Sequence, residues 1–180
     1  MKKKIFKSLI LCFGIVILII IGYVIFILTS YYRIDNNLNL QIENEALYDI
    51  VEMNKEYKIT TYNIGFGAHS QNYTFFMDKG ETLDGQKTKG KWSKARSIEE
   101  VNFNTSGAIN TIKNLSPDFC LFQEVDTYAT RSFKIDQYQM IKNEMLNYNS
   151  TFGENFHSTY LPYPFHDMHG RVNAGIATLS

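Results

Sequence analysis

A run of twenty uncharged residues, Leu9 to Leu28, constrains this chain more than any other feature of its sequence. A helix of that length crosses a hydrocarbon core about 30 Å thick, whereas a buried core helix needs no such uninterrupted apolar run. We therefore predict a transmembrane helix in residues 9–28, with a membrane as the partner of this segment.

Four lysines precede the apolar run and bear on how it is used: Lys2, Lys3, Lys4 and Lys7. A cleaved signal peptide usually has an apolar region of only about 7–15 residues and a small-residue cleavage site, and we find neither. An uncleaved signal anchor is therefore favoured over a cleaved leader. The positive-inside tendency then predicts a single-pass protein of the cell membrane with a cytoplasmic amino terminus and an extracellular domain.

The remaining chain divides into a linker and one folded domain. Residues 1–29 make the cytoplasmic tip and anchor, residues 30–56 the stalk, and residues 57–180 a domain of common size. Within the stalk, the spacing of apolar residues from Leu40 to Val51 predicts one short amphipathic helix.

The charge of the exported part differs from that of the whole chain. The sequence has 18 basic and 18 acidic residues, but four of the basic ones precede the anchor, so 14 remain against 18. A mildly acidic domain argues against a nucleic-acid binder held by a broad basic face, although it leaves open an enzyme that neutralises phosphate with a metal. Cys12 lies in the anchor and Cys120 in an apolar stretch, so no disulfide framework is predicted.

Two strand-like stretches organise the domain, Tyr57 to Gly65 and Asp118 to Asp126. A helix that begins at Ser93 or Ser97 and ends at Leu115 is predicted between them, because apolar residues recur on one face and Ser116-Pro117 stops it. Strand, helix and strand in this order form a crossover unit with parallel strands. Asn63 and Glu124, at the ends of the two strands, are then expected at one edge of an open α/β sheet, where ligands bind.

The same stretches carry a resemblance to a known family. TTYNIGFG (residues 60–67) and SPDFCLFQEVD (residues 116–126) resemble the first two signature motifs of the endonuclease/exonuclease/phosphatase superfamily, and GIATLS (residues 175–180) is similar to a later strand of that family. The resemblance implies an α/β fold: part of a four-layer α/β sandwich of the deoxyribonuclease I-like type, here preceded by one transmembrane helix.

The resemblance also implies a chemistry. Glu124 resembles the family's Mg²⁺-binding carboxylate, and Asn63 resembles the asparagine beside the metal and the scissile phosphate; Mn²⁺ is an alternative ion. Both residues are therefore expected to be catalytic and metal-binding. The implied activity is hydrolysis of a phosphodiester or phosphomonoester by metal-activated water. Its substrate is a nucleic acid, a lipid head group or an inositol phosphate, and nothing points to a protein partner.

Several residues beyond Glu124 are candidates for substrate contact. Tyr128 and Arg131 lie in a polar loop after the second strand, where Arg131 either donates to a phosphate or pairs with Asp126 or Asp136.

A second group of candidates lies between Leu161 and Asn173. His169 and Arg171 are expected on the substrate side. A His-x-x-His spacing formed by His166 and His169 raises a zinc interpretation, which is weak because no Cys or third His accompanies it.

The other elements are predicted from periodicity and composition. Gln137 to Leu146 favours a second helix, Thr151 to Tyr160 a strand, and residues 174–180 a further strand. Residues 65–93 form a long polar connection, interpreted as either a solvated basic loop or a phosphate-facing lid.

The family's second half supplies an Asp-x-Asn pair and a terminal Ser-Asp-His, and this sequence ends before either. We therefore expect a fragment or a prematurely ended reading frame that binds metal weakly and hydrolyses nothing. Two alternatives stay open: a catalytically silent extracellular binding module on the same scaffold, and an unrelated α/β domain with coincidental motifs.

Overall fold

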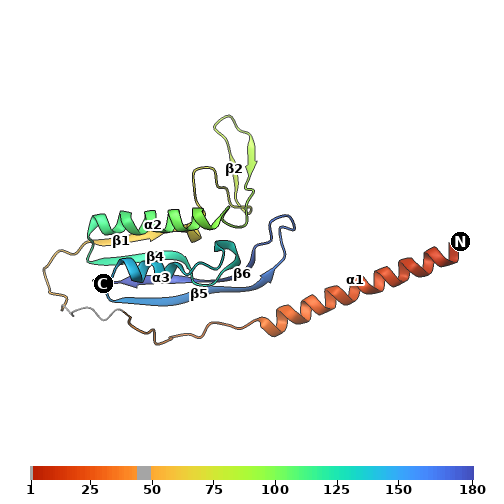
Figure 1. Cartoon of the computed structure of the whole chain (residues 1–180), viewed down its shortest axis with the longest axis horizontal. Helices are drawn as coiled ribbons and strands as arrows, with labels where there is room; N and C mark the ends of the chain where they lie inside the picture. Colours follow the sequence, from red (N-terminus) through yellow and green to blue (C-terminus); the bar gives the residue numbers. More distant parts are fainter. Residues whose placement is uncertain (1, 44–49) are drawn as a thin grey trace. The chain divides into compact units, whose positions relative to one another are not determined.

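The apolar run lies within one long helix, α1 (Lys2–Ser30), shown in red in Figure 1. The computed structural model describes residues 2–43 and 50–180, which divide into an amino-terminal unit up to Arg33 and a second unit from Ile34 onward. From Lys3 to Ser30 the mean hydropathy reaches 3.2 and no part of the most apolar window is buried. Within the described ranges, α1 is the one helix long and apolar enough to span a membrane.

The second unit is built on a four-stranded mixed sheet. Its strands are β1 (Ile59–Asn63), β4 (Phe119–Asp126), β5 (Ser150–Leu161) and β6 (Gly170–Leu179), in the order β1-β4-β6-β5. β1 runs parallel to β4, with Ile59 opposite Phe119 and Asn63 opposite Gln123, as the crossover unit predicts. The β4–β6 and β6–β5 pairs are antiparallel.

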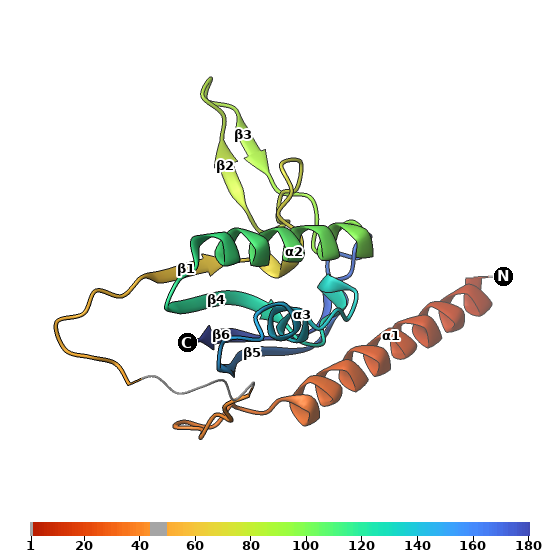
Figure 2. The same cartoon turned by 60° about the vertical axis from the view of Figure 1, so that its left-hand side comes forward.

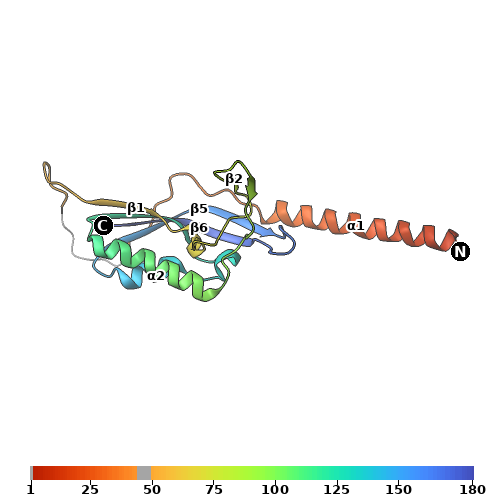
Figure 3. The ribbon, with the colours of Figure 1, turned by 90° about the horizontal axis from the view of Figure 1, so that it is seen from above.

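Two helices, α2 (Ile98–Leu115) and α3 (Gln137–Glu144), cover the same face of this sheet (Figure 3). Ser97 accepts a hydrogen bond from the Glu100 backbone N–H and begins α2, and the left-handed Ser116 ends it. Ile109 and Ile141 pack from the two helices against the inward side chains of β4 and β6. The shared core is formed by Ile64, Ala108, Ile109, Ile112, Cys120, Phe122, Val125, Tyr138, Ile141, Met145, Ala177 and Leu179.

The long polar connection contains a two-stranded antiparallel ribbon that the sequence analysis did not predict. β2 (Lys79–Glu81) and β3 (Lys87–Lys89) are fully exposed, and the ribbon projects away from α2 and the sheet (Figure 2). A strand with no buried face shows no alternation of apolar and polar residues, so periodicity misses it. The Asp84-Gly85 pair at its turn was the available signal.

The stalk differs from its prediction where it is described. Residues 40–43 and 50–51 are not helical, and the remainder of the expected helix, residues 44–49, lies outside the described residues. Glu43 instead forms an isolated bridge with Ser150 of β5 and an ion pair with Lys142. Part of the segment assigned to the linker therefore packs on the domain.

Two short left-handed or 3₁₀ turns complete the domain: η1 (Gly65–Gly67) after β1 and η2 (Thr130–Ser132) after β4. The strands and α3 agree with their predicted positions within a few residues, except that β6 begins at Gly170 rather than near residue 174. The described chain is thus a mixed α/β domain with one amino-terminal apolar helix.

Candidate functional site

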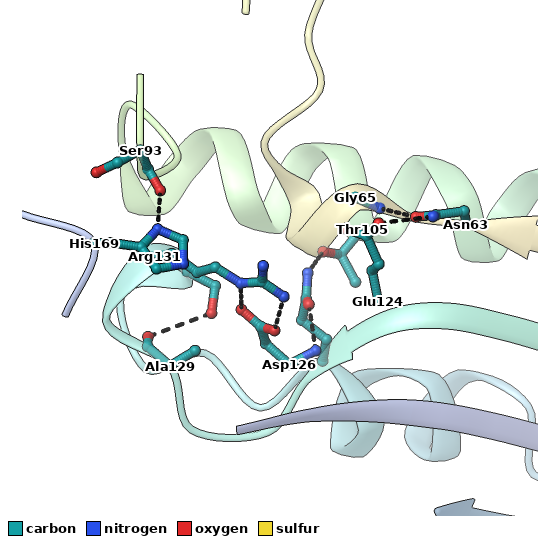
Figure 4. A network of polar contacts seen from close by, with 11 residues as sticks. Asn63, Gly65, Ser93, Thr105, Glu124, Asp126, Ala129, Arg131 and His169 are labelled. Atoms are coloured by element: carbon teal, nitrogen blue, oxygen red, sulfur yellow. Dashed lines mark hydrogen bonds and ion pairs between the residues drawn. The ribbon is translucent and has the colours of Figure 1, made fainter. Parts of the chain in front are cut away.

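Asn63 and Glu124 are in direct contact at the edge where β1 and β4 end (Figure 4). The Asn63 side-chain amide donates to Glu124 Oε1 over 2.9 Å, and the Asn63 side-chain oxygen accepts from the Gly65 backbone N–H over 2.8 Å. Both residues are exposed to solvent. The parallel pairing of the strands brings together two side chains that are far apart in sequence, as predicted.

A β-bulge in β4 directs the Glu124 side chain away from the core. Phe122 pairs with Ala177 and Val125 with Gly175, so Gln123 and Glu124 together lie opposite Ile176. Cys120 and Phe122 face the helices, and regular alternation would bury Glu124 beside them. The bulge restores Val125 to the core and leaves the carboxylate in solvent, where its charge carries no burial cost.

The bulge has a conformational cost at Glu124. Its φ of 53° lies in the left-handed region, which is unfavourable for a residue with a side chain. Such strain persists only where surrounding structure enforces it, and it concentrates at functional positions. The Phe66 backbone, in the η1 turn that follows Asn63, is also left-handed, with φ of 45°.

Glu124 lies between two open pockets. One, of about 600 Å³, lies between β1 and α2 and includes Asn63, Gly65 and Asn104 in its lining. The other, of about 470 Å³, lies beyond β4 and includes Asp78, Arg131 and His169. Glu124 and His69 are lining residues of both pockets.

His69 is a site residue that the sequence analysis missed. Its ring packs edge-on against Phe66 and tilted against Tyr73, with centroid distances of 5.8 and 5.0 Å. A Cβ on Gly65 would lie 2.4 Å from His69 Cδ2, so a glycine at position 65 is what allows the ring to approach the end of β1. The Gly65-x-Gly67 pair beside a histidine was the sequence signal for this arrangement.

Arg131 is buried and pairs with Asp126. Its guanidinium donates from Nε to Asp126 Oδ2 over 3.1 Å and from Nη2 to Oδ1 over 2.8 Å, and it lies 4.2 Å from the ring centroid of Phe66. Arg131 was predicted either to donate to a phosphate or to pair with Asp126 or Asp136, and in the structure it pairs with Asp126. Because Arg131 also lines the pocket beyond β4, its contact with a substrate phosphate stays a prediction.

Gln137 connects this ion pair to the helices. Its side-chain oxygen accepts from the Asp126 backbone N–H over 2.9 Å, and its amide donates to Thr105 of α2 over 2.8 Å. Both side chains are buried, and each polar contact is made in a dry environment where it is strong. The network fixes the end of β4, and with it the Glu124 bulge, against α2 and α3.

His169 is buried beside Arg131 (Figure 4), where its Nδ1 makes a hydrogen bond of 2.8 Å to the Ser93 carbonyl oxygen. Burial lowers the pKa of His169 below 6.5, and Arg131 lowers it further, which favours the neutral ring. Asp167 accepts from the Ser93 backbone N–H and pairs with Lys94 at 3.2 Å. Burial alone would raise the pKa of Asp167, but these contacts bring it below 3.8.

The other predicted substrate contacts are Tyr128 and Arg171. Tyr128 is half exposed with the Lys134 ammonium 5.3 Å from its ring centroid, and Arg171 is exposed on β6. Neither is among the lining residues of the two pockets beside Glu124. His166 is exposed, whereas His169 is buried and makes a hydrogen bond to the Ser93 carbonyl oxygen. This arrangement does not support the interpretation of the two histidines as zinc ligands.

The donor set fits a hard cation better than zinc. Among the described residues, no three His, Cys, Asp or Glu side chains gather as a metal-binding group. Zinc sites need three or four such ligands, whereas Mg²⁺ is commonly held by one or two carboxylates, with waters and substrate phosphate completing its shell. Glu124 Oε2 is the oxygen that Asn63 does not contact in this pair. Asn63 is positioned to orient the carboxylate, and its direct ligation of a metal stays a prediction.

The sequence matches no protein-family model, no curated protein and no solved structure. Membership of the endonuclease/exonuclease/phosphatase superfamily thus stays a prediction from the motifs.

Proposed function

We propose that residues 57–180 form the amino-terminal part of a deoxyribonuclease I-like four-layer sandwich that works as a membrane-anchored, Mg²⁺-dependent phosphoesterase. The contact between Asn63 and Glu124 at the ends of two parallel strands is the observation that supports this most strongly. It joins the two residues that the motifs single out, at the sheet edge where α/β domains bind ligands.

In this proposal each residue has a distinct role. Glu124 supplies the charged oxygen for the metal, and the bulge presents it to solvent and to both pockets. Asn63 fixes the orientation of the carboxylate by donating to Oε1 and adds no charge that would repel a phosphate. A bound Mg²⁺ supplies Lewis-acid polarisation of a phosphoryl oxygen and stabilises charge on the leaving alkoxide.

The pocket beyond β4 is the better place for the phosphate ester. Arg131, whose Nε and Nη2 already donate to Asp126, lines it together with Glu124, so a guanidinium group lies beside the carboxylate proposed to hold the metal. Mn²⁺ is expected to replace Mg²⁺, because both ions take oxygen ligands in octahedral geometry.

A binding measurement tests the metal role without requiring turnover. The full chain in detergent is titrated with Mn²⁺, and free Mn²⁺ is read by electron paramagnetic resonance. We expect saturable binding that Mg²⁺ displaces and that Glu124→Gln weakens at least tenfold, since the variant removes the charge but keeps the shape. Glu81→Gln, which removes an exposed carboxylate of β2, serves as the control and should bind as the parent does.

The outcomes separate the candidate functions. Equal Mn²⁺ affinity in the parent and Glu124→Gln would remove the metal role and leave the silent binding module as the better reading of this scaffold.

The proposed location is the cell membrane, with the amino terminus in the cytoplasm and the domain outside. The four lysines before the apolar run and the length of α1 support it. In spheroplasts of a bacterial host that express the chain, external protease should degrade the domain and spare an amino-terminal tag. Protection of the domain with loss of the tag would reverse the proposed orientation.

A further inference from the structure

The β2–β3 ribbon carries lysines on one face and no buried side chain. Lys79 lies directly opposite Lys89, and Lys87 opposite Glu81, so all four side chains share a face by the two-residue period of the strands. Every residue of both strands is exposed. The opposed lysines Lys79 and Lys89 destabilise the ribbon, whereas the opposite charges of Glu81 and Lys87 stabilise it.

Within the described residues Lys79, Lys87 and Lys89 form no ion pair, although carboxylates of the ribbon itself lie nearby, with Glu81 directly opposite Lys87. The ion pairs among the described residues engage other cations, and Lys94, just beyond the ribbon, pairs with Asp167. Lys91 extends the basic surface, with its ammonium 4.3 Å from the Trp92 ring centroid, and Arg96 lies 5.7 Å from the same centroid. A surface of this kind is complementary to an anionic partner.

The turn of the ribbon carries one exposed apolar side chain, Leu83, among polar residues that include the Asp84 carboxylate. Leu83 lies in the turn between β2 and β3 and is fully exposed, and Met77, just before β2, is 65% exposed. Two exposed aromatic residues lie beside the base of the ribbon: the Tyr163 ring is 6.0 Å from Phe76 and 6.1 Å from Phe165. Apolar side chains next to lysines are typical of elements that rest in a lipid interface, where the apolar groups leave water and the ammonium groups reach head groups.

The base of the ribbon is held firmly, so that the tip is presented in a fixed direction. Phe76 N–H donates to the Trp92 carbonyl over 2.8 Å, and Gly90 N–H donates to the Asp78 carbonyl over 2.9 Å. A Cβ on Gly90 would lie 1.6 Å from the Phe75 carbonyl oxygen, so the two backbone segments that contain Gly90 and Phe75 are in close contact there. Figure 2 shows the ribbon extending beyond α2 and the sheet on this base.

The same chain supplies a means of reaching a membrane. α1 is long and apolar enough to span a bilayer, and Glu43 is fixed on β5 by paired backbone hydrogen bonds with Ser150. Residues 31–42 between them extend at most about 40 Å. A lipid surface is therefore within reach of the domain at a high effective concentration.

We propose that the β2–β3 ribbon is a membrane-contacting element, which binds the head groups of an anionic bilayer with Lys79, Lys87 and Lys89 and places Leu83 in the interface. A nucleic acid offers the same negative charge, but it offers no apolar layer for Leu83, Met77 and Phe165. The proposal does not depend on Glu124 or on a metal.

The experiment places a reporter at the tip of the ribbon in the full chain. Leu83→Cys is labelled with an environment-sensitive dye in a Cys12→Ala background, since Cys120 is buried and unreactive in the folded protein. The protein is reconstituted in vesicles of phosphatidylcholine alone or with a quarter of phosphatidylglycerol. We expect a blue shift, and quenching by spin-labelled lipid, in the anionic vesicles only.

The lysine face is tested by a triple variant with a matched control. A lysine near an anionic surface strengthens binding about fivefold, so Lys79→Gln/Lys87→Gln/Lys89→Gln should lower the ratio of inserted to free ribbon about a hundredfold. Removing the same charge elsewhere, in Lys55→Gln/Lys113→Gln/Lys134→Gln, should leave the ratio unchanged. A label at Leu146→Cys, another exposed leucine, should report water in every vesicle.

Three results would overturn the proposal. One is a Leu83 label that stays in water in anionic vesicles, and another is an equal response from the two lysine triples. The third is a lysine-dependent response to single-stranded oligonucleotide in neutral vesicles, which would assign the ribbon to nucleic acid. Mn²⁺ binding should be the same in both lysine triples, so failure of the metal site and failure of the ribbon are distinguishable.

Discussion

His169 shows how a side chain near the candidate site is adapted to its surroundings. Its ring is buried, it makes a hydrogen bond to the Ser93 carbonyl, and it lies beside the Arg131–Asp126 pair. Sequence analysis predicted that His169 lies in a loop on the substrate side. In the structure His169 lines the pocket beyond β4, and it contacts Ser93, which is 76 residues away in the sequence. Local sequence holds no information about that contact, which depends on how two loops meet.

The lowered pKa of His169 predicts a stability loss in mild acid. Burial lowers the folded-state pKa below 6.5, so the unfolded chain binds the proton more readily. The stability that this residue contributes is therefore fully present above pH 6.5 or so and is lost as the pH falls through the folded-state pKa. His169→Gln should flatten the fall in the free energy of unfolding between about pH 7 and pH 5, measured by urea titration in detergent.

The exposed His166 provides the control for this prediction. His166→Gln replaces an exposed histidine of the same loop and controls for the loss of a histidine side chain as such. An equal effect of the two substitutions would show that burial of His169 is not the cause.

At the scale of elements, the strands and helices that form the core follow from the sequence. Ile109 and Ile112 of α2 recur with helical spacing, Ser97 and Ser116 mark its ends, and parallel pairing of β1 with β4 follows from the helix between them. The bulge at Glu124 could not be predicted from the sequence, because it arises from the register of β4 against β6, a strand about fifty residues later. The ribbon was missed because neither of its strands packs on a core.

The left-handed conformation of Glu124 predicts that two truncations at this position differ in stability. Glu124→Ala and Glu124→Gly both remove the hydrogen bond from Asn63, but only glycine adopts φ of 53° without steric cost. The glycine variant should be more stable than the alanine variant by about 1 kcal/mol, measured by urea unfolding. The same pair of substitutions at Glu81, which has no left-handed φ, should favour alanine. Greater stability of Glu124→Ala would mean that the bulge does not strain this residue.

The whole molecule contains an apolar helix long enough to span a membrane and an α/β domain with a carboxylate and an amide at one sheet edge. The helix and the pairing of Asn63 with Glu124 were predicted from length, composition and strand order. His69 was not predicted as a site residue, because it reaches the site through a tight turn after β1 and not along a strand. The features that could not be predicted from the sequence therefore depend on turns and on contacts between distant segments.

Paramagnetic broadening by Mn²⁺ probes whether a divalent cation binds where Asn63 meets Glu124. In the full chain labelled with ¹⁵N, trace Mn²⁺ should first broaden the side-chain amide of Asn63 and the backbone amide of Gly65, which the structure places on either side of the Asn63 oxygen. The backbone amide of Gly85, at the turn of the ribbon, should remain sharp. Broadening that begins elsewhere and spares Asn63 and Gly65 would mean that the cation does not bind at Glu124.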